Sequence, residues 1–207
     1  SPGDPLVLDV LSRLYEAAGE HESVATVLAH AVDTLSEPVD QLPLMQRIGE
    51  IYDKRLRDPE RAQRWYEAAL AIEPTHPPAV AALDLIYEGS ASWEALIVMH
   101  LAVAERVDDA QRRASAHARI AEIFERNVGQ LEEAIRHHCQ ALALDPTLET
   151  SFKALARLYQ SHGRYHELIE LYERGIEQAR EGDVVIAYLF KIGAIFEDAL
   201  GDPSSAL

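Results

Sequence analysis

Apolar and small residues recur at spacings of three and four along the whole chain. A stretch that reads RIGEIYD begins at residue 47, returns as RIAEIFE at residue 119 and again as KIGAIFE at residue 191, so the pattern repeats every 72 residues. Spacings of three and four place side chains on one face of a helix. Because no segment of useful length alternates with period two, we expect an all-α protein without strands.

Each 72-residue unit divides into two similar halves. The same apolar position recurs at intervals that alternate between 37 and 35 residues, at Leu11, Ile48, Leu83, Ile120, Leu155 and Ile192. Repeats of this length predict a solenoid of stacked helix pairs. Gly, Asp-Pro and Pro-rich turns separate a first from a second helix in each half. We predict first helices near 5–18, 41–56, 77–89, 112–128, 148–161 and 184–200, and second helices near 21–35, 60–73, 92–107, 131–144 and 165–180.

The second helices share a further pattern, seen in AQRWYEAALAIEP at 62–74 and in AIRHHCQALALDP at 134–146. An alanine is followed four residues later by an aromatic residue or histidine, then by Ala-Leu and a closing Pro. The first helices add a small residue and an aromatic residue three positions later, as in Gly49 and Tyr52. This combination resembles the tetratricopeptide repeat. The resemblance implies a right-handed α-solenoid of stacked antiparallel helix pairs.

The resemblance extends over nearly the whole chain. We expect residues 1–207 to form one solenoid of about five and a half repeats, bounded near 5–41, 42–76, 77–113, 114–148, 149–185 and 186–207. The last repeat stops at the start of its second helix, which indicates a fragment of a longer array. Because terminal repeats ordinarily have a polar outer face, we expect this apolar end to stack end to end on a neighbouring copy.

The charge of the chain bears on its partners. It has 19 basic and 35 acidic residues, a net charge of −16. Nucleic acids and anionic membrane surfaces would be repelled, because both are bound through Lys and Arg. No apolar run approaches the roughly 20 residues that span a bilayer. A single cysteine agrees with a reducing compartment, so we expect a cytoplasmic protein, and the high Ala and Arg content is compatible with a bacterial one.

Candidate catalytic chemistry was sought among the histidines and the cysteine. The run His-His-Cys at 137–139 is the obvious metal-binding candidate, but adjacent helical residues point about 100° apart and cannot converge on one ion. His138 shares its column with Tyr66 and Tyr172, which indicates a packed, hydrogen-bonded core histidine. Cys139 lacks the basic neighbours that activate a thiol. We therefore expect no enzyme, no cofactor and no metal site.

The resemblance implies that the first helices line a concave groove that takes a peptide or a helix of a partner protein. Their outward positions hold more acids than bases, with a small apolar floor at Ala81, Leu85 and Ala118. We predict a protein-interaction scaffold that binds a basic or amphipathic segment there. The candidate partner-binding residues are Glu50, Asp53, Leu85, Glu88, Glu122, Glu125, Lys153 and Arg157.

A second interpretation remains open. The same face is also what a solvated surface of an acidic protein looks like, with Arg47–Glu50 and Arg119–Glu122 as ion pairs three residues apart. The chain would then be a structural spacer within a larger multidomain protein, with no ligand in the groove.

Overall fold

The computed structural model describes residues 5–199, and within them the side chains of residues 7–197. In this part of the chain every element is helical. The chain divides into two compact units, one ending at Arg106 and the other beginning at Val107. The all-α fold class is confirmed.

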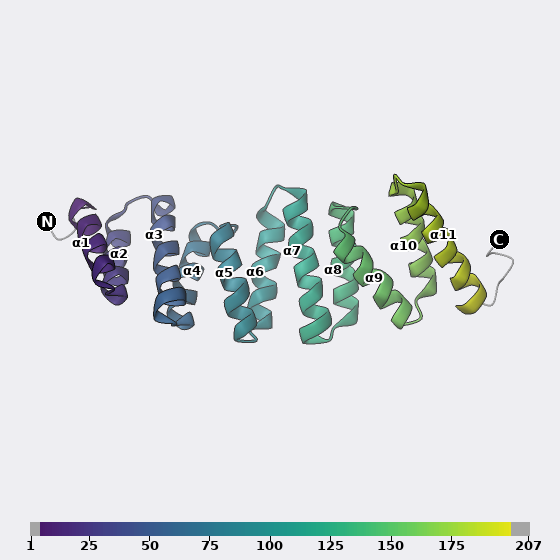
Figure 1. The fold of residues 1–207 in the computed structure, drawn as a ribbon, viewed down its shortest axis with the longest axis horizontal. Helices are drawn as coiled ribbons and strands as arrows, with labels where there is room; N and C mark the ends of the chain where they lie inside the picture. Colours follow the sequence, from purple (N-terminus) through teal and green to yellow (C-terminus); the bar gives the residue numbers. More distant parts are fainter. Residues whose placement is uncertain (1–4, 200–207) are drawn as a thin grey trace. The chain divides into compact units, whose positions relative to one another are not determined.

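Six α-helices build the first unit, in which each helix packs beside the one before it in the chain (Figure 1). They are α1 (Pro5–Ala18), α2 (His21–Thr34), α3 (Pro38–Glu50), α4 (Pro59–Ile72), α5 (Pro77–Gly89) and α6 (Trp93–Arg106), with the π-helical turn η1 (Ile51–Leu56) continuing α3.

The second unit repeats this arrangement of consecutive helix pairs. It contains α7 (Ala110–Ile123), α8 (Leu131–Leu144), α9 (Glu149–Ser161), α10 (Tyr165–Gln178) and α11 (Gly182–Ala194), with π-helical turns η2 (Phe124–Val128) after α7 and η3 (Ile195–Ala199) after α11.

The predicted helices are confirmed, with shifts of a few residues at some ends. The largest is at α3, which begins at Pro38 instead of near residue 41. Proline fits the first position of a helix, where its missing N–H would have no partner in any case. The expected turn at Asp202 and Pro203, the helix start after it and the stacking of this end lie outside the described residues.

The π-helical turns were not predicted, and they follow from one additional residue. In α1 the carbonyl of Tyr15 accepts a hydrogen bond from the amide of Glu20, five residues later. In the next repeat Tyr52 accepts from Asp58, six residues later. The wider π turn takes up the additional residue. In both repeats the residue just before the second helix, Glu20 or Asp58, therefore still bonds to the carbonyl of the aromatic residue.

The small residue Gly49 lies where the two helices of its pair approach closely. A Cβ atom on Gly49 of α3 would lie 2.7 Å from the ring of Tyr66 on α4, and this ring is almost fully buried. Asp84 holds the equivalent position on α5, one residue after Leu83 as Gly49 is one after Ile48, and it faces a different partner. Its Oδ1 lies 2.6 Å from Nε2 of His100, which replaces the tyrosine.

The aromatic residues at the position of Tyr52 in the first helices are shielded from solvent. Tyr52, Tyr87 and Tyr159 are buried, and Phe124 and Phe196 are half-buried. In the second unit Tyr159 belongs to an apolar cluster drawn from α8, α9 and α10. Burying these rings is a main stabilising contribution, at about 25 cal/mol per Å² of apolar surface.

Candidate functional site

The first-helix face of the first unit is formed by α3, η1 and α5. Glu50 ends α3, Asp53 lies in η1, and Leu85 and Glu88 lie three residues apart on α5. Leu85 is 71% exposed although it is a large apolar residue, and Glu88 is exposed beside it on the helix surface. This face therefore combines an exposed apolar side chain with carboxylates.

The two carboxylates at the end of α3 lie near a buried tyrosine. Burial raises the pKa of Tyr66, and the negative charges of Glu50 and Asp53 raise it further. Glu50 also accepts a hydrogen bond from Nε2 of Gln46 at 3.0 Å, and Nζ of Lys54 lies 4.0 Å from its other oxygen. Glu50 and Asp53 are thus brought to one place, with Glu50 held by its neighbours on the same helix.

The corresponding face of the second unit is closed by its own ion pairs. Nη2 of Arg157 on α9 donates to Oε1 of Glu125 in η2 at 2.5 Å. Lys153 pairs with Glu149 on the same helix at 2.7 Å. Both basic residues expected to bind a partner therefore have carboxylate partners within the protein.

Two expected ion pairs have different outcomes. Nη1 of Arg119 lies 3.4 Å from Oε2 of Glu122, as the spacing predicts. The predicted pair between Arg47 and Glu50 is wrong, because Nη2 of Arg47 donates to Glu16 of the preceding repeat at 2.5 Å. The long guanidinium side chain of Arg47 reaches an acid on the neighbouring first helix, α1.

Ala118 does not contribute to an exposed apolar floor. It is buried on α7, whereas Ala81 is exposed on α5. A methyl group projects so little from a helix that longer neighbours can cover it. Of the three residues of the predicted floor, Ala81 and Leu85 are exposed, and both lie in the first unit.

Three histidines of the second unit, His117, His137 and His138, contribute to its interior. His138 is buried and its Nδ1 lies 3.1 Å from Oγ of Ser151, which confirms the packed histidine. The Nδ1 atoms of His117 and His137 lie 3.0 Å apart, so that one ring donates and the other accepts. Burial lowers the pKa of all three, to about 4 for His137 and His138.

Residues 5–199 contain no group of three or more His, Cys, Asp or Glu side chains placed to hold a metal ion. Over the same residues, none of the helices has the length and apolar character to cross a membrane.

Sequence models of the tetratricopeptide repeat match residues 42–76, 116–150 and 151–184, together about half of the chain. The chain is 25% identical over 146 residues to anaphase-promoting complex subunit 7 of Arabidopsis thaliana. That match covers 70% of this chain and 24% of the plant protein, so the chain spans about a quarter of that relative's length.

Solved structures of MamA have a similar fold. One aligns with a TM-score of 0.55 and 19% identity, and the match covers 88% of this chain and 98% of the MamA chain. Another aligns with a TM-score of 0.53 and 12% identity, and the match covers 83% of this chain and 90% of the MamA chain. At this level of identity the likeness concerns the fold, a solenoid of helix pairs.

Proposed function

The chain belongs to the tetratricopeptide repeat family of protein-interaction scaffolds, and we propose that the first helices of its first unit bind a basic or amphipathic segment of a partner protein. The observation that carries this proposal is the exposed side chain of Leu85 on a face that also holds Glu50, Asp53 and Glu88. An amphipathic segment would place an apolar side chain on Leu85 and Lys or Arg beside the carboxylates.

Comparison of the two units supports this choice. Counting back 72 residues from Glu125 and Arg157 gives Asp53 and Leu85. The ion pair of the second unit is thus replaced in the first by a carboxylate and an apolar side chain. Three acids and no base stand among the four candidate residues of the first unit, against two acids and two bases in the second. A cationic partner is therefore favoured at the first unit.

In the second unit, Glu122, Glu125, Lys153 and Arg157 would have a smaller role. A partner would have to displace intramolecular ion pairs to reach Glu125 or Lys153. We propose that these four residues give the second unit a weaker binding face of its own, whereas the first unit supplies most of the affinity.

The net charge of −16 supports a protein partner over a nucleic acid, which would need a basic surface. It also disfavours an anionic membrane surface. The single cysteine supports a location in the reducing cytoplasm.

The proposal is tested by a crosslinked pull-down with the wild-type chain and a charge-reversed variant. Glu50→Lys with Asp53→Lys reverses the face, and Glu60→Lys with Glu105→Lys makes the same change in charge at exposed positions on α4 and α6. We expect a partner that is captured by the wild type and by the control but lost with the reversed face. The crosslinked peptide should contain Lys or Arg.

Two outcomes would contradict the proposal. Equal capture by the reversed face and by its control would place the partner elsewhere on the chain. If the folded wild type captured no partner through this face, the spacer interpretation would be favoured. In that interpretation the length of the repeat array matters and the charge of the face does not.

A further inference from the structure

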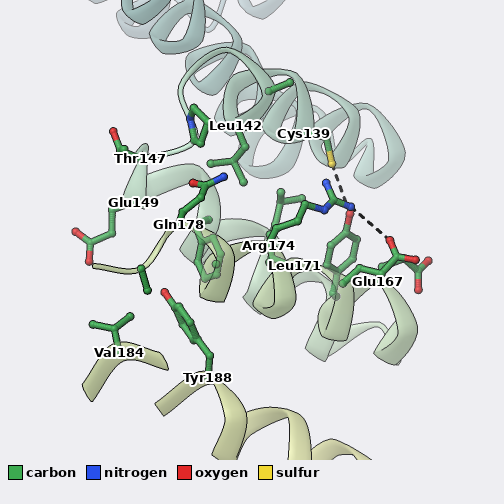
Figure 2. Close-up of a pocket in the computed structure, with 18 residues that line it drawn as sticks. Cys139, Leu142, Thr147, Glu149, Glu167, Leu171, Arg174, Gln178, Val184 and Tyr188 are labelled. Atoms are coloured by element: carbon green, nitrogen blue, oxygen red, sulfur yellow. Dashed lines mark hydrogen bonds and ion pairs between the residues drawn. The ribbon is translucent and has the colours of Figure 1, made fainter. Parts of the chain in front are cut away.

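A cavity of about 490 Å³ opens in the second unit, on a side of the helices that the first-helix face does not use. Figure 2 shows Cys139 and Leu142 of α8 facing Leu171 and Arg174 of α10, with Tyr188 of α11 at one end. This volume is within the range of about 300–1,000 Å³ that is common for ligand pockets.

The floor of the cavity is apolar and comes from the first helix between α8 and α10. Phe152, Leu155 and Tyr159 of α9 lie there. Lys153 and Arg157 are on another face of the same helix, because successive residues turn by about 100°. A ligand in the cavity would therefore not compete directly with one on the first-helix face.

Residues that line the cavity differ from those of the internal copy. The residue 72 positions before Cys139 is Glu67, which accepts a hydrogen bond from Tyr87 at 2.8 Å. In the second unit the equivalent hydroxyl, of Tyr159, lies 3.5 Å from the smaller Cys139 sulfur.

A second replacement removes a whole side chain. Val103, which is buried, corresponds to Gly175 on α10. A Cβ atom on Gly175 would lie 2.9 Å from the ring of Tyr188 and 3.1 Å from that of Phe152. The glycine therefore lets both aromatic rings approach the helix and form an aromatic wall, which a valine at this position would prevent.

Charge decides what kind of ligand suits the cavity. Three carboxylates, those of Glu149, Glu167 and Glu170, stand around it with one guanidinium, that of Arg174. Arg174 is already paired with Glu170, at 3.4 Å, and Glu149 with Lys153, at 2.7 Å. The carboxylate of Glu167 is left without an ion pair among the described residues, and the faces of aromatic rings also attract cations. An apolar group with a positive charge beside it is favoured, and an anionic one is disfavoured.

We propose that this cavity is a second docking site, which takes a large apolar side chain from a partner segment that carries Lys or Arg next to it. The apolar side chain lies on Phe152 and Leu155, between α8 and α10. The basic residues lie at the rim, near Glu167. This site adds a second point of attachment to the scaffold and does not depend on the occupant of the first-helix face.

The test uses three synthetic peptides, acetyl-GKKFLKKG-amide, acetyl-GEEFLEEG-amide and acetyl-GKKGGKKG-amide. Because Cys139 carries the only thiol of the chain, its rate of modification by a chromogenic aryl disulfide reports occupancy of the cavity. We expect the first peptide to slow the modification and to bind roughly tenfold or more tightly than the other two. Equal binding of the glycine peptide, or tighter binding of the glutamate peptide, would overturn the proposal.

A matched pair of variants locates the binding. Ala143→Trp fills the mouth of the cavity from an exposed position on α8, and Ala71→Trp makes the same change at the equivalent exposed position on α4. We expect the first variant to weaken binding of acetyl-GKKFLKKG-amide roughly tenfold or more and the second to leave it unchanged. Unchanged binding to Ala143→Trp would show that the peptide lies elsewhere, and would also overturn the proposal.

Gly175→Val is a second way to fill the cavity, with the residue of the internal copy. Its folding is checked first by circular dichroism, because the valine meets Tyr188 and Phe152. Leu85→Arg alters the first-helix face alone, and we expect it to leave binding in the cavity unchanged. If Leu85→Arg weakened peptide binding as much as Ala143→Trp does, the cavity would not be a separate site.

Discussion

Arg157 on α9 donates a hydrogen bond to Glu125 in η2 at 2.5 Å, and the pair joins the first helices of two successive repeats. The internal copy of this pair is Asp53 and Leu85, which cannot form it. In the second unit the guanidinium of Arg157 thus neutralises the carboxylate of Glu125. In the first unit the apolar side chain of Leu85 takes the position of that guanidinium. This difference is the physical basis for assigning the partner to the first unit.

Exchanging these residues should affect stability little. Leu85→Arg adds an exposed pair, worth no more than about 0.5 kcal/mol. Arg157→Leu leaves Glu125, which is 17% exposed, without its partner, and should cost about 1 kcal/mol in the free energy of unfolding. Urea denaturation measures both. A loss above about 3 kcal/mol would show that the pair is a major structural contact and not a surface one.

The close approach of α3 and α4 predicts a strong effect at Gly49. Gly49→Ala places a methyl group against the buried ring of Tyr66 and should destabilise the chain by about 1–3 kcal/mol. Gly89→Ala is the matched control, because a Cβ atom there meets nothing within 4 Å. Thermal unfolding should give a lower Tm for the first variant and an equal or higher one for the second. Equal Tm values would mean that the helices can separate at no cost.

The turn after η1 predicts a stabilising substitution. Arg57 has φ of 56°, in the left-handed region, where the equivalent residue of the second unit is Gly129 with φ of 74°. Arg57→Gly should therefore stabilise the chain by about 1 kcal/mol, and Gly129→Arg should destabilise it by a similar amount. Denaturant titration of both variants measures the change. Opposite signs would show that contacts of the arginine side chain outweigh the backbone strain.

The buried histidines predict a loss of stability in mild acid. The pKa of His137 and of His138 is about 4 in the folded chain, against an ordinary value of 6.5, because burial disfavours the charged ring. Between pH 4 and 6.5 the unfolded chain therefore binds more protons than the folded chain. The contribution of the neutral histidines to the free energy of unfolding is complete above pH 6.5 and is lost as the pH falls toward 4. Each histidine contributes up to about 1.4 kcal/mol per pH unit.

This pH dependence can be separated from that of the carboxylates by comparing variants. The free energy of unfolding between pH 7 and 5 should fall less steeply in His138→Gln than in the wild type. His30→Gln, which changes an exposed histidine, should have the wild-type slope. If His138→Gln had that slope too, the pKa of the ring would be the same in the folded and the unfolded chain.

The sequence was sufficient for the helices because the repeat supplies the same information several times. A single apolar pattern is ambiguous, but six copies in frame, with Gly or Pro at each turn, locate the helices within a few residues. The buried position of His138 followed in the same way, from its column with Tyr66 and Tyr172. The physical origin of both results is that each helix pair must cover its neighbour's apolar side.

Features that depend on one copy differing from another were missed. A signal for the π turns was present, because Leu11 and Val24 are 13 residues apart whereas Ile48 and Ala62 are 14 apart. The cavity is lined by two small residues, Cys139 and Gly175. Whether small residues leave a cavity depends on how the rings of Phe152 and Tyr188 pack, which the sequence does not show.

Ion pairs between repeats were missed for a different reason. Arg47 has acids within reach on its own helix and on the helix before it, and the choice of Glu16 over Glu50 depends on how two repeats are stacked. Spacing along one helix does not contain that information. The same holds for Arg157 and Glu125.

The central claim is that the first-helix face of the first unit binds a basic segment through Leu85 and its neighbouring carboxylates. The most direct test is isothermal titration of the crosslinked peptide, made synthetically, into the wild-type chain, Leu85→Arg and Arg157→Leu. We predict that Leu85→Arg weakens binding roughly tenfold or more, about 1.4 kcal/mol, whereas Arg157→Leu binds as tightly as the wild type or more tightly. Equal affinity of Leu85→Arg and the wild type would contradict the claim.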